Sequence, residues 1–476
     1  MAAGGRCAAG RGATVEPMNF GFLLLSAGLT ASALVPSTPE WVPCADNPAA
    51  LCTTIEVPVD WSDPDGDQFG LAAARHPATG EKHGTIVYLP AGPGSSGVDA
   101  VSNEQTLGML LPPQVVEHFD VVSFDPRGVR RSSPVLCDSA LVSTLYRPEP
   151  RNQAEFEDLL AAQAAVGADC RERTGPVFDH LDSTQVARDV DRLRAVLGED
   201  RLNLYALSYG TVAGQMYAEQ FPERIRTLVL DGVYDHSVDS GRFAEVSALA
   251  GQESFDQFVA WCDTDPACSL HGTDVRARLA ALYDRAEAGT LPEAVDPGEL
   301  TSRVVSPLTR PDLPAVAAEI TRLEAPAAPA SPRTQGAPST ETMPLPIFLQ
   351  CADNRNDLAS YADVEELAAR TRAVAPDVRS GAYDTATLCI NPPVPATNPQ
   401  RPLDADDAPP IMVLTSRYDA ATPYQGAQHV AAQLPDSVLV TYDGMGHGAA
   451  TRSDCTKSLV HRYFSDTTLP TSATRC

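Results

Sequence analysis

The fold is decided by residues 202–214, which read LNLYALSYGTVAG. The first six are apolar enough to predict a strand, and the residues from Gly210 onward predict a helix. Ser208 therefore lies at a strand-to-helix turn, which holds its hydroxyl clear of the sheet at a helix N-terminus. Such a turn brings backbone close to backbone and needs small residues on either side, here Ala206 and Gly210. A serine that caps an ordinary helix is the alternative at this point.

Strands alternate with helices on both sides of this turn, which predicts βαβ units and a mostly parallel sheet. We expect strands at 53–59, 69–75, 84–89, 119–124, 202–207, 226–230, 411–414 and 437–442, and helices at 153–168, 185–197 and 453–464. Between residues 235 and 345 the pattern changes to helical stretches (255–261 and 275–288) and a Pro/Ala/Ser-rich connector (324–342). The prediction is one α/β domain, residues 34–234 and 346–476, interrupted by a largely helical lid at 235–345.

Residues 1–33 have the pattern of a secretory signal peptide. Arg6 and Arg11 precede a short apolar stretch at 20–25, and Ala31-Ser32-Ala33 matches a cleavage site. A membrane anchor is the alternative, but the strongly apolar part is short for a span. We therefore expect a secreted protein without permanent membrane association.

Ten cysteines follow the signal, and an even number in an exported chain indicates disulfides. Zinc is the competing idea, but there is no C-x-x-C pair and no matching histidine cluster, so no metal is expected. Pairing sequence neighbours closes the shortest loops: 44 with 52, 137 with 170, 262 with 268, 351 with 389 and 455 with 476. Other pairings remain open. The net charge of −27 argues against nucleic acid or an anionic membrane as partner.

Three residues with complementary chemistry each follow an expected strand, in the order Ser208, Asp419, His447. The carboxyl ends of parallel strands share one edge, so the three side chains should converge there. A serine hydroxyl needs a base such as His447, and Asp419 would fix the imidazole tautomer. Asp231 is a weaker rival acid, and Asp443 is poorly placed because it ends the strand that leads to His447.

A glycine-rich turn after the strand at 84–89 offers the remaining part of such a site. The negative charge of a tetrahedral intermediate needs two fixed backbone N–H donors. Tyr209 supplies one, and Gly92 is expected to supply the other because Pro93 has no N–H. A plain Gly-Pro turn is the alternative.

The motifs AGPG (91–94), DPRGV (125–129), LSYGT (207–211), LDGV (230–233), WC (261–262) and GHG (446–448) occur in sequence. Together they resemble the secreted bacterial tripeptidyl aminopeptidases, relatives of the prolyl aminopeptidases in the α/β-hydrolase superfamily. The resemblance covers nearly all of the chain after the signal. It implies an α/β-hydrolase fold and a serine exopeptidase without metal or organic cofactor. Ala91 and Ala206 stand where the family often has glycine, and Arg130 replaces the second glycine of an R-G-x-G-R pattern.

The resemblance also implies acidic residues near the lid that hold the ammonium group of a substrate. The candidates are Glu245, Glu253, Asp256 and Asp353, and no motif selects one of them. We expect a monomer that acts on peptides with a free N-terminus. Two other interpretations stay open: a secreted carboxylesterase that uses the same Ser208, Asp419 and His447, and a hydrolase-like binding protein without catalysis.

Overall fold

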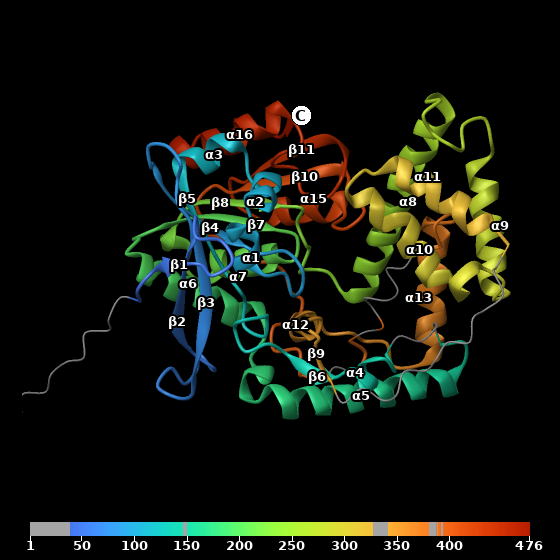
Figure 1. Ribbon diagram of the computed structural model, residues 1–476, viewed down its shortest axis with the longest axis horizontal. Coiled ribbons are helices and arrows are strands. Elements are labelled where there is room, and N and C mark those ends of the chain that lie inside the picture. The colour runs from blue at the N-terminus through green and yellow to red at the C-terminus, as the bar shows by residue number, and fades with distance from the viewer. Residues whose placement is uncertain (1–38, 146–149, 327–340, 380–386, 388, 392–393) are drawn as a thin grey trace, which may run out of the picture. The chain divides into compact units, whose positions relative to one another are not determined.

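The computed structural model describes residues 39–145, 150–326, 341–379, 387, 389–391 and 394–476. The predicted signal peptide and most of the predicted connector lie outside these residues. Ten strands pair in the order β1-β2-β3-β5-β4-β7-β8-β10-β11-β12 (Figure 1). They are β1 (Val42–Pro43), β2 (Leu51–Pro58), β3 (Gln68–His76), β4 (Gly84–Leu89), β5 (Phe119–Phe124), β7 (Leu202–Leu207), β8 (Ile225–Asp231), β10 (Met412–Tyr418), β11 (Val438–Met445) and β12 (Thr474–Arg475).

The sheet is antiparallel at one end and parallel through the rest. The pairs β1–β2, β2–β3 and β3–β5 are antiparallel. Each pair from β5 to β12 is parallel. The prediction of a mostly parallel α/β sheet is confirmed, and the carboxyl ends of β4, β7, β8, β10 and β11 lie along one edge.

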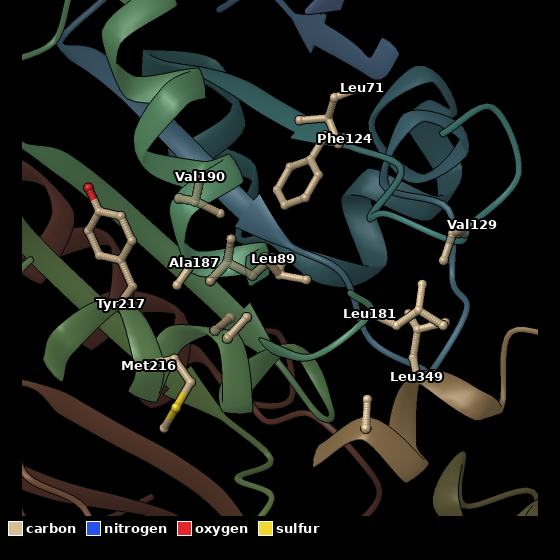
Figure 2. Close-up of a cluster of buried hydrophobic side chains, with 14 of the residues drawn as sticks. Leu71, Leu89, Phe124, Val129, Leu181, Ala187, Val190, Met216, Tyr217 and Leu349 are labelled. Carbon is tan, nitrogen blue, oxygen red and sulfur yellow. The ribbon is translucent and has the colours of Figure 1, made fainter. Parts of the chain in front are cut away.

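Helices cover both faces of the sheet. On one face lie α6 (Ser183–Leu197), α7 (Gly210–Gln220) and α15 (Tyr424–Gln433), whereas α5 (Gln153–Thr174) packs on the separate short strand β6 (Leu136–Asp138). On the other lie α1 (Gly97–Ser102), α2 (Glu104–Leu110), α3 (Pro113–His118) and α16 (Asp454–Asp466). Figure 2 shows the first face, where Val190 of α6 and Met216 of α7 belong to the same buried cluster as Leu89 and Phe124 of the sheet.

Local sequence explains where these helices begin and end. The Asp182 side chain accepts hydrogen bonds from Thr184 N and Gln185 N, which caps the start of α6. Gly198, at a left-handed φ of 71°, ends it. Val186, Val190 and Leu193 recur at helical spacing and are buried, so one face of α6 packs on the sheet.

A separate helical group contains α8 (Ser240–Thr264), α9 (Val275–Glu287), α10 (Pro297–Val305) and α11 (Leu313–Glu324), joined by the 3-10 turns η3 (Pro292–Ala294) and η4 (Ser306–Thr309). These helices bury a core of their own, which includes Phe255, Leu279 and Ile320. The group also takes in α13 (Tyr361–Val374), because Ala375 and Val378 at its end belong to that core. α13 lies beyond residue 345, where the sequence places the end of the lid.

Shorter elements complete the described chain. They are α4 (Ser139–Val142), α12 (Phe348–Asp353), the 3-10 turns η1 (Pro176–Asp179) and η2 (Pro222–Arg224), and a two-stranded sheet of β6 (Leu136–Asp138) and β9 (Thr342–Pro344). Five disulfides join sequence neighbours, as predicted: Cys44–Cys52, Cys137–Cys170, Cys262–Cys268, Cys351–Cys389 and Cys455–Cys476. Within the described residues, every helix is too short or too polar to cross a membrane.

Candidate active site

Ser208 occupies a strained turn between β7 and α7. Its φ of 58° lies in the left-handed region, which costs a residue with a side chain about 1–3 kcal/mol. The backbone holds it there: Ser208 N–H donates to Asp231 O at 2.9 Å, and Thr211 N–H donates to Ser208 O at 2.9 Å. Ser208 therefore stands at the carboxyl edge of the sheet, with its backbone fixed by the next strand.

The turn leaves no room for larger residues around it. A β-carbon on Gly210 would lie 2.4 Å from Leu89 O and 2.6 Å from Pro90 O. The extra methyl group of Ala206 fits because Gly214 lies opposite, where a β-carbon would be 3.1 Å from Ala206 Cβ. The replacement of glycine by Ala206 therefore leaves the turn intact.

Asp419 and His447 form a hydrogen-bonded pair just beyond β10 and β11. His447 Nδ1 lies 2.9 Å from Asp419 Oδ2 and 3.2 Å from Oδ1. Asp419 is 1% exposed and also accepts hydrogen bonds from Ala421 N at 2.8 Å and Thr422 N at 3.0 Å. Burial by itself lowers the pKa of His447, but the Asp419 carboxylate outweighs burial and raises that pKa above its ordinary value.

Thr422 also contacts the Asp419–His447 pair, and the sequence alone does not identify it. Its hydroxyl donates to Asp419 Oδ2 at 2.9 Å and lies 3.2 Å from His447 Nδ1. The hydroxyl thus helps to hold the carboxylate beside the imidazole. A threonine three residues after Asp419 is the only sequence signal, and it is too common to be informative.

Asp231 holds the backbone of the loop that carries His447, and its charge adds to that of Asp419 in raising the pKa of His447. Its carboxylate accepts hydrogen bonds from Ala449 N at 2.8 Å, Ala450 N at 3.0 Å and the Tyr205 hydroxyl at 2.9 Å. Burial raises the pKa of Asp231. The other rival, Asp443, is ion-paired with Arg475 at the surface.

The backbone after β8 brings His447 to the Ser208 turn. A β-carbon on Gly232 would lie 3.0 Å from His447 Cε1, so the imidazole packs directly on this residue. Gly232 follows Asp231, whose carbonyl accepts the Ser208 N–H. One short segment, Asp231-Gly232, therefore contacts both the Ser208 backbone and the His447 ring.

The loop after β4 lies against the same turn. Gly92 has a φ of 135°, which only glycine adopts readily. Asp125 anchors the far end of the loop, where it accepts hydrogen bonds from the Ser96 hydroxyl and from Val98 N at 3.2 Å. Among the described residues, no acceptor takes a hydrogen bond from the Gly92 or Tyr209 amide.

The helical group contacts the edge that carries the aspartate and the histidine. His447 N–H donates to Thr309 O of η4 at 2.7 Å. Ser254 Oγ of α8 donates to Tyr418 O at 3.4 Å, one residue before Asp419. Part of the lid thus lies over this edge.

The four acidic candidates for binding a substrate amine lie in different settings, and all have partners. Three are ion-paired: Glu245 with Arg370 at 2.7 Å, Glu253 with Arg417 at 2.8 Å and Asp256 with Arg276 at 2.8 Å. Asp353 is 0% exposed, and its carboxylate accepts hydrogen bonds from Ser183, Asn398 and Tyr209. This burial favours a structural role for Asp353, because its carboxylate is closed off from solvent and fully hydrogen-bonded. No cluster of three or more potential metal ligands occurs in the described part of the chain.

Two family models match the chain. One, described as TAP-like protein, covers residues 375–476, and the other, described as alpha/beta hydrolase fold, covers residues 84–282. Serine protease Hip1 of Mycobacterium tuberculosis is 31% identical over 506 aligned positions, which span 92% of this chain and 90% of that protein. Carboxylesterase B of the same organism is 32% identical over 512 positions, 98% of this chain and 94% of that one. Tripeptidyl aminopeptidase of Streptomyces lividans is 30% identical over 448 positions, 86% of this chain and 81% of that one.

Proposed function

Since the chain belongs to the tripeptidyl aminopeptidase-like serine hydrolases of the α/β-hydrolase superfamily, we propose that it is a secreted exopeptidase that releases di- or tripeptides from free N-termini. Ser208 is the nucleophile, His447 the general base and acid, and Asp419 the residue that orients His447. The observation that carries these three roles is the Asp419–His447 pair, joined at 2.9 Å and packed on Gly232 beside the Ser208 turn, and the tripeptidyl aminopeptidase relative supports the choice of an exopeptidase.

The geometry supports an acyl-enzyme mechanism. Ser208 Oγ attacks the scissile carbonyl carbon while His447 Nε2 takes the hydroxyl proton, and Asp419 stabilises the imidazolium at Nδ1. The amides of Gly92 and Tyr209 donate to the oxyanion of the tetrahedral intermediate. The C–N bond then breaks, His447 gives its proton to the leaving amine, and Ser208 keeps the short peptide as an ester. Water, deprotonated by His447, hydrolyses that ester and frees Ser208.

Glu253 is the acidic residue best placed to bind the ammonium group of the substrate. It pairs with Arg417, which lies two residues before Asp419 on β10, so Glu253 faces the catalytic edge from α8. The Arg417 guanidinium lies 5.0 Å from the ring centroids of both Tyr418 and Tyr424, which fixes it and leaves the Glu253 carboxylate preorganised. A free N-terminal ammonium would gain a charge-assisted hydrogen bond there that an acetylated N-terminus cannot make.

Five disulfides support the secreted location, because such bonds persist in oxidising compartments and are rare in the cytosol. The pattern at residues 1–33 supports it independently.

A carboxylesterase is the second candidate function. The relative named carboxylesterase B matches 98% of this chain, and ester hydrolysis needs the same nucleophile, base and oxyanion donors. The two functions differ in what the lid binds, so the substrate must decide between them.

The test compares three chromogenic substrates on purified protein: a tripeptide anilide with a free amine, its N-acetylated twin and a short acyl ester. We expect turnover of the free-amine anilide, at least about tenfold weaker kcat/KM on the acetylated twin, and loss of all turnover in Ser208→Ala. Glu253→Gln should raise KM for the free-amine substrate and leave KM for the acetylated substrate unchanged. Glu245→Gln, on the same helix, is the matched control. Ester hydrolysis with neither anilide cleaved would refute the exopeptidase proposal.

A further inference from the structure

We propose that the segment Leu345–Asp353 positions both donors of the oxyanion hole, holding Tyr209 through its side-chain hydroxyl and the Gly92 loop through Pro346. The proposal rests on the proposed function, in which the amides of Tyr209 and Gly92 stabilise the oxyanion. It gives Asp353 a positioning role in place of the substrate-binding role expected from the sequence.

The backbone amide of Tyr209 lies at the oxyanion hole, whereas its side chain is hydrogen-bonded to the segment Leu345–Asp353. Its hydroxyl donates to the Asp353 carboxylate and lies 3.1 Å from Leu349 O. The ring is 9% exposed and packs edge-on against Tyr234 at a centroid distance of 5.8 Å. Burial raises the pKa of Tyr209, and the Asp353 charge adds to that effect, so the hydroxyl stays protonated and remains a donor. The tether fixes the ring, and with it the backbone one residue beyond Ser208.

Asp353 is built as an anchor. Its Oδ1 accepts hydrogen bonds from Ser183 N at 2.9 Å and Asn398 Nδ2 at 2.7 Å, and its Oδ2 accepts one from Ser183 Oγ at 2.6 Å in addition to that from Tyr209. Four donors to a carboxylate that is 0% exposed leave it little freedom to move. The donors come from the start of α6, the nucleophile turn and the loop near residue 398, so Asp353 joins three separate parts of the chain.

The other end of the same segment packs on the loop that carries Gly92. A β-carbon on Gly94 would lie 2.2 Å from Pro346 Cγ, so the proline ring fills the space beside the loop. Leu345 N–H donates to Val135 O at 3.0 Å, which fixes the start of the segment.

The segment is held firmly between these two contacts. Leu349 packs beside Leu181 in the buried cluster of Figure 2, where both approach Gly128. Cys351 is bonded to Cys389. A rigid segment that holds the Tyr209 side chain and contacts Gly94, two residues beyond Gly92, can keep the separation of the two donors constant, and oxyanion stabilisation depends on that separation.

Tyr209→Phe tests the tether because it removes the hydroxyl and keeps the backbone amide. Tyr234→Phe is the matched control, since Tyr234 is 8% exposed, contacts the same ring and donates to Asn354 Oδ1 at 3.1 Å. Each variant is measured for kcat and KM, for inhibition by a peptide boronate that forms a tetrahedral adduct, and for its melting temperature. The assay uses the anilide or the ester, depending on which of them the wild-type enzyme cleaves. The exopeptidase proposal can therefore fail while the proposed role of the segment Leu345–Asp353 is still tested.

We expect Tyr209→Phe to lower kcat by about 10- to 100-fold, to weaken the boronate by a similar factor and to leave KM unchanged. Tyr234→Phe should lower the melting temperature comparably but keep kcat and boronate affinity within about twofold of wild type. Pro346→Ala should repeat the Tyr209→Phe effect through the other donor. Wild-type kcat and boronate affinity in a folded Tyr209→Phe would overturn the proposal. Equal catalytic losses in Tyr209→Phe and Tyr234→Phe would overturn it as well.

Discussion

Gly210→Ala would move the loop that carries the proposed oxyanion donor Gly92. A β-carbon at position 210 would lie 2.4 Å from Leu89 O, whereas real β-carbons stay beyond 3.0 Å, so the two backbones must separate by at least 0.6 Å. Gly92 is three residues beyond Leu89 on that backbone. The distance range over which a donor stabilises an oxyanion is about 0.4 Å wide, so a movement of this size takes the Gly92 amide out of range.

The expected loss is that of one oxyanion donor, about 10²- to 10³-fold in kcat, with little change in KM. Overpacking of the turn should also destabilise the fold by about 1–3 kcal/mol. The assay combines steady-state kinetics, thermal melting and the affinity of a peptide boronate, all at a temperature where the variant is folded. The boronate reports directly on stabilisation of a tetrahedral adduct.

Gly108→Ala is the matched control. Gly108 lies in α2, is exposed, and a β-carbon there would meet nothing within 4 Å. This change should leave kcat unchanged and should stabilise the protein by up to about 1 kcal/mol through helix propensity. A folded Gly210→Ala enzyme with wild-type kcat and boronate affinity would refute the assignment of the loop to oxyanion binding.

Three further predictions concern the histidine loop and a disulfide. His447 must be neutral to accept a proton, and its pKa is raised, so kcat/KM should rise with pH through a midpoint above about 6.5. Asp419→Asn should lower activity by about 10⁴-fold. The same change should move the midpoint down, because burial then dominates the pKa of His447. Asp231→Asn should cost about 2–4 kcal/mol in thermal unfolding and reduce kcat, because two buried N–H groups of the histidine loop lose a carboxylate acceptor. Replacing Cys351 and Cys389 by serine should cost up to about 4 kcal/mol in denaturant unfolding, given their sequence separation of 38 residues. A midpoint at or below 6.5, an unaltered Asp231→Asn enzyme, or an unchanged unfolding midpoint would contradict these expectations in turn.

Continuous apolar runs made the central sheet predictable. Residues 84–89, 119–124 and 202–207 form β4, β5 and β7 with the expected bounds, because central parallel strands are buried on both faces. The order serine, aspartate, histidine after such strands is enough to expect the three residues at one edge; there the structure places the Asp419–His447 pair and the Ser208 turn at the ends of β10, β11 and β7. Cysteines that are close in sequence also paired as predicted.

Long-range packing made the helical group and the roles of the acidic residues harder to predict. α8 runs from Ser240 to Thr264, whereas the sequence predicts a helix only at 255–261, because the first half of α8 is rich in small and polar residues that are buried against α13. Asp353 and Glu253 cannot be told apart by sequence, because both are acidic residues near the lid and no motif selects either of them. Its partners Ser183 and Tyr209 are 170 and 144 residues away, so only the folded chain distinguishes an anchor from a ligand.

The products formed from one defined peptide would decide whether the protein is an exopeptidase. A decapeptide with a free N-terminus and its N-acetylated twin would be incubated with wild-type protein and with Ser208→Ala, and the fragments identified over time by mass spectrometry. We expect stepwise release of di- or tripeptides from the free N-terminus by wild-type protein, slow or no cleavage of the acetylated peptide, and intact peptide with Ser208→Ala. Internal cleavage, cleavage of both peptides at equal rates, or no cleavage by an enzyme that hydrolyses esters would contradict it.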